Sequence, residues 1–375
     1  MNGSAAQQSS REIRISADSH MGEPPDLWET RLPEKFRDRA PRFPHVAPYE
    51  SNHHLRAGCW DPHARLADLA IDGISAEVLF PTLGVQSWLV DDPELERACI
   101  RVYNDWMIEF CNVAPERYWG LAMISLWDID EAVKELERCH NAGLRGASIW
   151  LVPPPELPYA SDHYERFWDV AQSLEMPVNM HINARWTPRQ PNPGEEKLRQ
   201  MHSVNGHKID AMNALGQIIG SGVLERYPHL KVAVAETGVG WIPFWLQEFD
   251  YYSNRSNTRH LLPAPPSTYF RRQVYATFIS DGVGAQLVSD FGKDNFMWSN
   301  DYPHPACIWP GASGVIERDL GHLTPEVRAN VIAGNAARVF NNGQLPPPAD
   351  PIPEQYQPLD DLWFKWHEPI VAGSA

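Results

Sequence analysis

Short apolar runs alternate with longer amphipathic segments along most of the chain. The runs have the length and composition of β-strands, and the first of them alternates apolar and polar residues. They occupy residues 13–19, 76–81, 120–125, 146–152, 177–182, 231–236, 273–279 and 295–300. The pattern therefore predicts eight strands.

A segment with helical periodicity follows each predicted strand. Asp61 and Asp92 each precede a proline, which places an N-cap residue directly before a proline at the first helical position. After Asp92, the apolar residues Leu95, Cys99 and Val102 fall on one helical stripe. Helices are predicted for residues 61–73, 92–110, 131–141, 163–174, 203–227, 241–254, 285–291 and 325–340.

Eight strand-then-helix units in succession predict an α/β fold, the closed (β/α)₈ TIM barrel. An open doubly wound sheet with additions would give a similar alternation, but the number of units favours the barrel. We expect residues 1–342 to form it. Residues 343–375 form a proline-rich C-terminal extension that also carries Trp363, Phe364 and Trp366. We expect the extension to dock on the barrel or on a neighbouring subunit, in a homodimer or higher homo-oligomer.

Polar residues stand at the carboxyl ends of several predicted strands, where the active sites of such barrels lie. The first strand ends in Asp18 and His20, and a period of two places both side chains on one face. The fifth strand ends near His181 and the sixth near Glu236. The eighth ends at Asp301, directly before a Tyr-Pro turn. A barrel directs all these ends toward one cavity, although they are far apart in the sequence.

Asp18, His20, His181 and Asp301 carry carboxylate and imidazole groups, which bind Zn²⁺, Mn²⁺ or Fe²⁺. A mononuclear catalytic site needs about three or four such ligands and one open position. Each residue alone also has a structural explanation, such as an aspartate that caps a turn or a hydrogen-bonded buried histidine. Their shared position at strand ends favours the metal site. We therefore predict one divalent metal ion per chain, Zn²⁺ or Mn²⁺.

Three long segments depart from the short connections of a compact barrel: residues 21–60, 183–202 and 255–272. We expect all three to follow strands at the catalytic face, with residues 21–60 inserted as a lid. Their basic and aromatic side chains are suited to hold a small carboxylate-bearing substrate. The predicted substrate-binding residues are Arg185, Trp186, His54 and Arg56.

The composition excludes several kinds of partner. The chain has 48 acidic and 32 basic residues, a formal net charge of −16, which disfavours nucleic acid and anionic membranes. No run approaches the roughly 20 apolar residues of a membrane span, and the polar start lacks the apolar core of a signal peptide, so we expect a cytoplasmic protein. The five scattered cysteines predict buried free thiols rather than disulfides or a thiolate metal site.

Motifs along the chain resemble those of the amidohydrolase-2 family, metal-dependent barrels related to aminocarboxymuconate semialdehyde decarboxylase and the aromatic-acid decarboxylases. In order, they are residues 18–28 (DSHMGEPPDLW), His181, residues 240–245 (GWIPFW), residues 300–304 (NDYPH) and residues 334–338 (GNAAR). The resemblance covers nearly the whole chain. It implies a (β/α)₈ fold, a single divalent metal that is usually zinc or manganese, and decarboxylation or hydrolysis of a small, often aromatic, acid.

By matching position, the resemblance assigns the metal to Asp18, His20, His181 and Asp301. Asp18 stands where the family usually has histidine or glutamate. Glu236 stands near the histidine that usually ends strand 6 of the decarboxylases, and a carboxylate there is suited to act as a base. Residues 145–151 contain no lysine, so the carboxylated-lysine bridge of binuclear relatives has no candidate there.

These features predict a metal-dependent carboxy-lyase for a small aromatic or unsaturated carboxylic acid. In this hypothesis Asp301 delivers a proton to the carbon that loses CO₂, and Glu236 and His304 assist. The alternative is a hydrolase of a lactone, amide or carbon–carbon bond that uses metal-activated water. A third hypothesis, from another class, is a metal-binding barrel without catalytic turnover.

Overall fold

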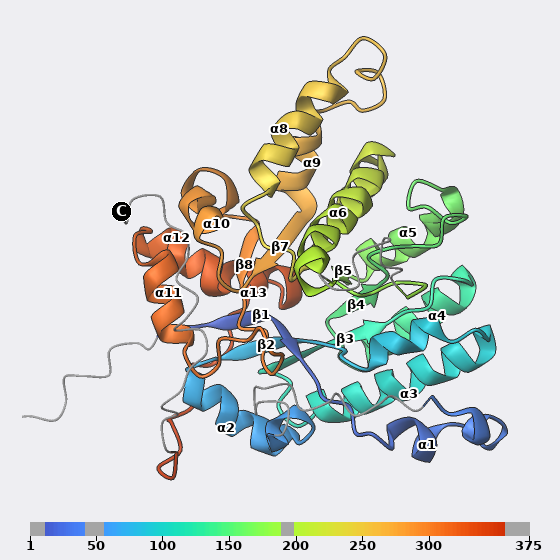
Figure 1. Ribbon diagram of the computed structural model, residues 1–375, viewed down its shortest axis with the longest axis vertical. Coiled ribbons are helices and arrows are strands. Elements are labelled where there is room, and N and C mark those ends of the chain that lie inside the picture. Colours follow the sequence, from blue (N-terminus) through green and yellow to red (C-terminus); the bar gives the residue numbers. More distant parts are fainter. Residues whose placement is uncertain (1–11, 42–55, 189–198, 357–375) are drawn as a thin grey trace, which may run out of the picture.

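The structure, a computed structural model, describes residues 12–41, 56–188 and 199–356. Eight parallel strands follow one another in chain order, and each overlaps a predicted run: β1 (Ile15–His20), β2 (Ala76–Phe80), β3 (Tyr118–Met123), β4 (Gly146–Ile149), β5 (Val178–His181), β6 (Val232–Ala235), β7 (Val274–Phe278) and β8 (Phe296–Trp298). Backbone hydrogen bonds from the N–H of Asp301 to the carbonyl of Asp18 (3.0 Å) and from the N–H of His20 to the carbonyl of Tyr302 (2.7 Å) join the two ends of the sheet. The predicted TIM barrel is confirmed (Figure 1).

Helices surround the strands, and every predicted helical segment overlaps at least one of these helices (Figure 1). Asp61 and Asp92 cap their helices as predicted, because each side chain accepts two backbone N–H groups of the first turn. The helices in these segments are α2 (Pro62–Asp72), α3 (Pro93–Cys111), α4 (Ile129–Asn141), α5 (Glu165–Ser173), α6 (Arg199–Gly220), α7 (Val223–Arg226), α8 (Ile242–Ser253), α10 (Gly282–Leu287), α12 (Pro325–Ala329) and α13 (Asn335–Phe340). The sequence pattern did not predict α11 (Ala312–Leu320). None of the described helices combines the length and the apolarity that crossing a membrane requires.

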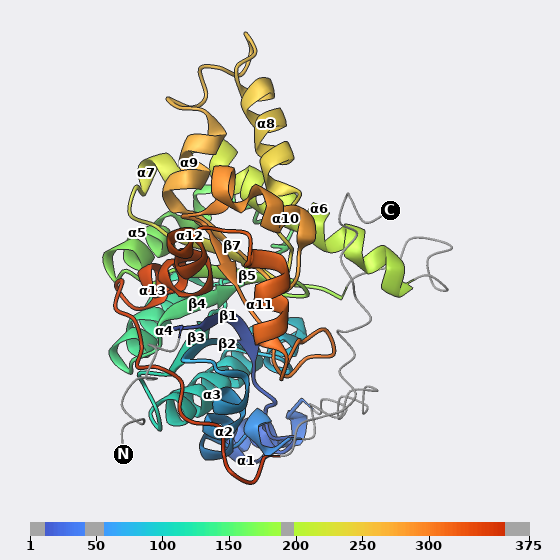
Figure 2. The same ribbon diagram turned by 90° about the vertical axis from the view of Figure 1, so that its left-hand side faces the viewer.

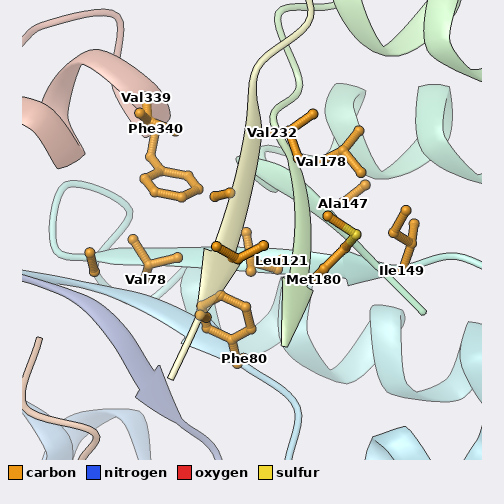
Figure 3. Close-up of a cluster of buried hydrophobic side chains, with 14 of the residues drawn as sticks. Val78, Phe80, Leu121, Ala147, Ile149, Val178, Met180, Val232, Val339 and Phe340 are labelled. Atoms are coloured by element: carbon orange, nitrogen blue, oxygen red, sulfur yellow. The ribbon is translucent and has the colours of Figure 1, made fainter. Parts of the chain in front are cut away.

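Apolar side chains from several strands fill the barrel. Figure 3 shows Val78 and Phe80 of β2 together with Leu121 of β3 and Met180 of β5, and Phe340 of α13 lies at the other end of this cluster from Phe80. The ring centroid of Phe80 is 5.1 Å from that of the predicted ligand His181. The packed core therefore forms the floor of the predicted site. All five cysteines are buried, and none of them forms a disulfide among the described residues, as predicted.

The prediction that residues 255–272 follow a strand at the catalytic face is wrong. They follow helix α8, continue into α9 (Pro266–Gln273) and lead into the amino end of β7. Figures 1 and 2 show that α8, α9 and their connection project from the barrel. This segment therefore belongs to the end of the barrel opposite the carboxyl ends of the strands.

The structure describes residues 21–41 and 56–60 of the predicted lid, and the lid itself stays a prediction. The described part contains α1 (Leu27–Arg31) and the 3₁₀ turns η1 (Glu34–Arg39) and η3 (Ala57–Cys59). The indole N–H of Trp28 donates to the carbonyl of Cys99 on α3 at 3.1 Å, and Arg31 pairs with Glu109 on the same helix at 2.8 Å. Helix α1 therefore packs against α3, whereas η3 packs against α2. Residues 42–55, which include His54, lie outside the described residues.

The described part of the C-terminal extension docks on the barrel, as predicted. Arg117, next to the start of β3, donates to the carbonyl of Pro348 at 3.1 Å and pairs with Asp350 at 2.9 Å. One arginine thus binds a backbone carbonyl and a carboxylate of the extension. The aromatic residues at positions 363, 364 and 366 lie outside the described residues.

Candidate active site

The predicted metal ligands meet at the carboxyl end of the barrel. The Nε2 atoms of His20, at the end of β1, and His181, at the end of β5, are 3.1 Å apart. Asp18 Oδ1 lies 3.4 Å from the first of these nitrogens and 3.5 Å from the second. Asp301, just after β8, places its Oδ1 3.4 Å from His20 Nε2. Four residues separated by up to 283 positions in the sequence thus form one cluster.

Glu236 and His304 complete the cluster. Glu236, which directly follows β6, places its Oε2 3.5 Å from His181 Nε2. His304 Nδ1 lies 3.2 Å from Asp301 Oδ1, and the ring of His304 stacks on that of His20 with centroids 3.6 Å apart. The five polar residues predicted at the strand ends and His304 therefore lie together.

The backbone turns sharply where two of the acids stand. Glu236 has a φ of 58° and Asp301 a φ of 56°, both in the left-handed region. Aspartate tolerates this conformation better than glutamate does, and such residues cost about 1–3 kcal/mol each unless the surroundings hold them. Asn300 holds the second turn: its Oδ1 accepts hydrogen bonds from Ser16 (2.9 Å) and Ser19 (3.1 Å) of β1. This buried network fixes Asp301 against Asp18.

The donor set fits a cation. His20 Nδ1 faces the carbonyl of Pro81 at 3.2 Å, and His181 Nδ1 faces that of Ile182 at 2.8 Å. A carbonyl can only accept, so each Nδ1 carries its proton, and in the neutral rings both Nε2 lone pairs face each other. Asp18 Oδ1 and both carboxylate oxygens of Asp301 are buried without a hydrogen-bond partner among the described residues. A divalent metal ion would satisfy these five atoms together.

The buried carboxylates of the cluster require positive charge or protons to balance them. Burial, followed by the charge of Asp301, raises the pKa of Glu236 well above its usual range, and burial with the charge of Asp18 does the same to the pKa of Asp301. Burial would lower the pKa of His181, but the Asp18 carboxylate outweighs it and raises that pKa to about 9. The metal-free site thus draws protons to balance its carboxylates. A metal ion would compete with these protons for the same atoms.

His304 differs from His181. Burial and the neighbouring charge of His181 lower the pKa of His304 to about 3. Its ring is therefore neutral near pH 7, with one nitrogen as donor and the other as acceptor. Its Nε2 lies 3.0 Å from the hydroxyl of Thr82, and its Nδ1 faces Asp301. His304 thus connects the cluster to the segment after β2.

The sequence did not single out Thr277 of β7. Its hydroxyl donates to Asp18 Oδ2 at 3.2 Å and accepts the backbone N–H of Glu236 at 3.0 Å. One side chain thus orients a predicted ligand and the turn that carries Glu236. A threonine in an apolar strand is common, so the sequence held no signal for this role.

A cavity of about 510 Å³ opens over the cluster. Its apolar wall includes Leu83, Val85 and Leu89, from the segment after β2 that contains the 3₁₀ turn η4 (Gly84–Leu89). Arg185 also lines it and forms an ion pair with Asp210 of α6. Another hollow of about 590 Å³, beside α8 and residues 258–265, contains none of the metal-ligating groups found among the described residues. The chemistry therefore points to the cavity over the strand ends.

Two predicted substrate contacts lie elsewhere. The guanidinium of Arg56 pairs with the buried Asp68 and stacks over the ring of Trp309, 4.5 Å from its centroid, and it does not line the cavity. Trp186 is partly buried against the hydrophobic core and does not line the cavity either. Neither side chain is among the described residues that line the cavity, and their role as substrate contacts stays a prediction.

Comparison with known proteins agrees with this architecture. A family model described as Amidohydrolase matches residues 49–341. Gamma-resorcylate decarboxylase from Polaromonas sp. is 27% identical over 262 residues, which are 63% of this chain and 74% of that protein. The crystal structure of 5-carboxyvanillate decarboxylase from Sphingomonas paucimobilis has a TM-score of 0.68 at 23% identity and covers 88% of this chain and 99% of its own.

A dihydroxybenzoic acid decarboxylase from Polaromonas sp., solved with bound manganese and the inhibitor 2-nitroresorcinol, has a TM-score of 0.66 at 20% identity and covers 89% of this chain and 98% of its own. At these identities the structural likeness concerns the fold alone. The family model, by contrast, matches well over half of the chain, from residue 49 to residue 341. The chain therefore belongs to the amidohydrolase family.

Proposed function

We propose that this chain is a metal-dependent, non-oxidative decarboxylase of a small aromatic or unsaturated carboxylic acid. The observation that carries the proposal is the set of unpaired carboxylate oxygens of Asp18 and Asp301, which face the Nε2 atoms of His20 and His181 below a partly apolar cavity. The named relatives support it, because they are decarboxylases of aromatic acids and one of them binds manganese.

In this proposal Asp18, His20, His181 and Asp301 hold one divalent ion, manganese or zinc. When bound, such an ion would supply a Lewis acid for the substrate carboxylate and a neighbouring oxygen. Thr277 and Asn300 keep the aspartates in place, since the first binds Asp18 and the second holds the turn at Asp301.

Asp301 is the proposed proton donor. In the metal-free site, burial and the charge of Asp18 raise the pKa of Asp301. A carboxyl group that binds an ion through one oxygen can carry a proton on the other, so the same side chain can serve as ligand and as acid. The bond between the substrate carbon and its carboxylate carbon breaks, and the electron pair remains on the substrate carbon. The proton of Asp301 moves to that pair, and CO₂ leaves. His304 lies 3.2 Å from Asp301 and is placed to return a proton to it.

Other side chains of the cavity select the substrate. Leu83, Val85 and Leu89 offer an apolar wall for a ring or an unsaturated chain. Arg185 offers positive charge, although Asp210 shares it. Glu236 lies on the His181 side of the cluster, and burial raises its pKa in the metal-free site. In its protonated form it can donate a hydrogen bond to a substrate oxygen.

A substrate screen tests the proposal. Purified chain is loaded with manganese or zinc, and the metal content is measured by elemental analysis. It is then incubated with a panel of hydroxybenzoates and a panel of lactones, while CO₂ release and acid release are recorded separately. We expect CO₂ from at least one aromatic acid, and none from the Asp301→Asn control. Acid release from a lactone without CO₂ would replace the proposal with hydrolysis, and bound metal without any turnover would support a non-catalytic barrel.

A further inference from the structure

Glu23 is a buried acid outside the ligand cluster, with only 4% of its surface exposed. Its carboxylate accepts three backbone N–H groups in succession: those of Thr82 and Gly84 on Oε1, at 3.0 and 2.9 Å, and that of Leu83 on Oε2, at 2.9 Å. These groups begin the turn η4, whose own N-cap residue, Leu83, offers no side-chain acceptor. Glu23 therefore caps, from the segment after β1, a turn that follows β2.

The capped turn leads directly to the proposed proton donor. Thr82, whose N–H is bound by Glu23, places its hydroxyl 3.0 Å from His304 Nε2. His304 Nδ1 faces Asp301 Oδ1 at 3.2 Å. The threonine hydroxyl is attached to Cβ, which is bonded directly to the backbone. A shift of the Thr82 backbone would therefore move the hydroxyl as well. The contacts thus form a chain from Glu23 through Thr82 and His304 to Asp301.

We propose that Glu23 is a positioning residue for proton transfer, which acts through Thr82 to fix the orientation of His304. The inference rests on the proposed function, since it gives His304 the task of returning a proton to Asp301. A glutamine at position 23 would keep one acceptor oxygen but would turn an amide N–H toward the N–H of Leu83, which has no acceptor to offer. The turn would then shift or rotate away.

A double-mutant cycle tests the chain of contacts. The metal-loaded variants Glu23→Gln, Thr82→Val and His304→Gln are compared with the wild type in kcat and KM, together with the doubles that contain His304→Gln. We expect Glu23→Gln and Thr82→Val each to lower kcat about tenfold or more relative to the wild type. When His304→Gln is already present, adding either substitution should lower kcat by no more than about twofold. Thr82→Ser keeps the hydroxyl and should restore most of the rate.

Glu96→Gln is the matched control. Glu96 on α3 is as buried as Glu23, with 1% of its surface exposed, and it does not line the cavity. Its replacement is expected to change thermal stability and to leave kcat within about twofold of the wild type. An equal loss of kcat in Glu96→Gln and Glu23→Gln, or losses that add fully to that of His304→Gln, would overturn the positioning role.

A readout without turnover separates this inference from the proposed function. The ring nitrogens of ¹⁵N-labelled histidines are observed by NMR, and the signals of His304 are assigned by their loss in His304→Gln. Glu23→Gln and Thr82→Val should both shift these signals, whereas Glu96→Gln should not. Unchanged His304 signals in Glu23→Gln would refute the inference even in an active enzyme. Shifted signals would support it even if no aromatic acid released CO₂.

Discussion

Asp301→Asn replaces a carboxyl group, which can carry either a proton or a negative charge, with an amide of nearly the same shape. Asp301 is fully buried and has a φ of 56°. Asparagine has nearly the same volume and, apart from glycine, is among the residues that adopt this left-handed conformation most readily. Alanine at the same position would add backbone strain and a cavity. The asparagine variant therefore tests the chemistry of the carboxyl group.

The expected effect on turnover follows from the role of an acid. An amide oxygen can still face a metal ion, but an amide does not exchange a proton near pH 7. A positioned general acid contributes about 10²- to 10⁴-fold to a rate, which equals about 2.7–5.5 kcal/mol of activation free energy. We expect kcat to fall by about 10³-fold or more at saturating metal, while elemental analysis still finds about one ion per chain.

The same substitution should stabilise the metal-free protein. Burial and the charge of Asp18 raise the pKa of Asp301 well above its ordinary 3.8, so the folded chain binds this proton more tightly than the unfolded chain does. The resulting stability is fully present below pH 3.8 and is lost as the pH rises through the folded-state pKa, by about 1.4 kcal/mol for each pH unit between the two pKa values. Asparagine carries no such loss. The variant should therefore gain stability over the wild type as the pH rises.

Urea unfolding of chelator-treated proteins at about pH 4.5, 6 and 8 measures this difference. Steady-state kinetics of the metal-loaded proteins provide the rates. A near-normal kcat would give Asp301 a structural role. If the metal-free variant is less stable than the wild type at pH 8, the carboxylates of Asp18 and Asp301 do not repel each other in the folded protein. The predicted gain in stability would then be wrong.

Three further perturbations test other contacts. Arg185→Ala should raise KM for a carboxylate substrate about tenfold or more and change kcat little, because it removes a charged group that lines the cavity; an unchanged KM would exclude this contact. Arg65→Met should lower the free energy of unfolding by about 3–5 kcal/mol in urea titrations, because it leaves Glu77 buried without its partner; a loss below about 1 kcal/mol would contradict this. Thr277→Val should weaken metal binding about 10- to 100-fold in a competition with a chelator, because Asp18 loses a donor; Thr277→Ser, which keeps the hydroxyl, is the control.

The barrel could be predicted because its signals are local. Each strand is an apolar run buried on both faces, and the prolines and aspartates at the starts of α2 and α3 act within one helical turn. Two of the segments that the sequence pattern did not predict have weak local signals. Helix α1 has five residues, too few to show a periodicity, and α9 follows a helix with no intervening strand.

The ligand cluster could be predicted because topology alone brings strand ends together. The meeting of Asp18, His181 and Asp301 can be predicted without knowing how the loops fold, because a barrel places the ends of β1, β5 and β8 around one opening. The groups that hold them could not be found in this way. Thr277 is one threonine in an apolar strand, and the three N–H partners of Glu23 are set by how the chain turns after β2.

The charge predictions show where sequence reasoning reaches its limit. In a chain of net charge −16, acidic residues outnumber basic ones, so many basic side chains form ion pairs within the protein. Arg56 is held by Asp68, and Arg185 is shared with Asp210. The carboxylates of Asp18 and Asp301 lie beside His20, which lines the cavity, and would repel an anion. An anionic substrate can therefore approach the strand ends only if the cluster binds protons or a cation, and for this reason the identity of the bound ion and that of the substrate have to be determined together.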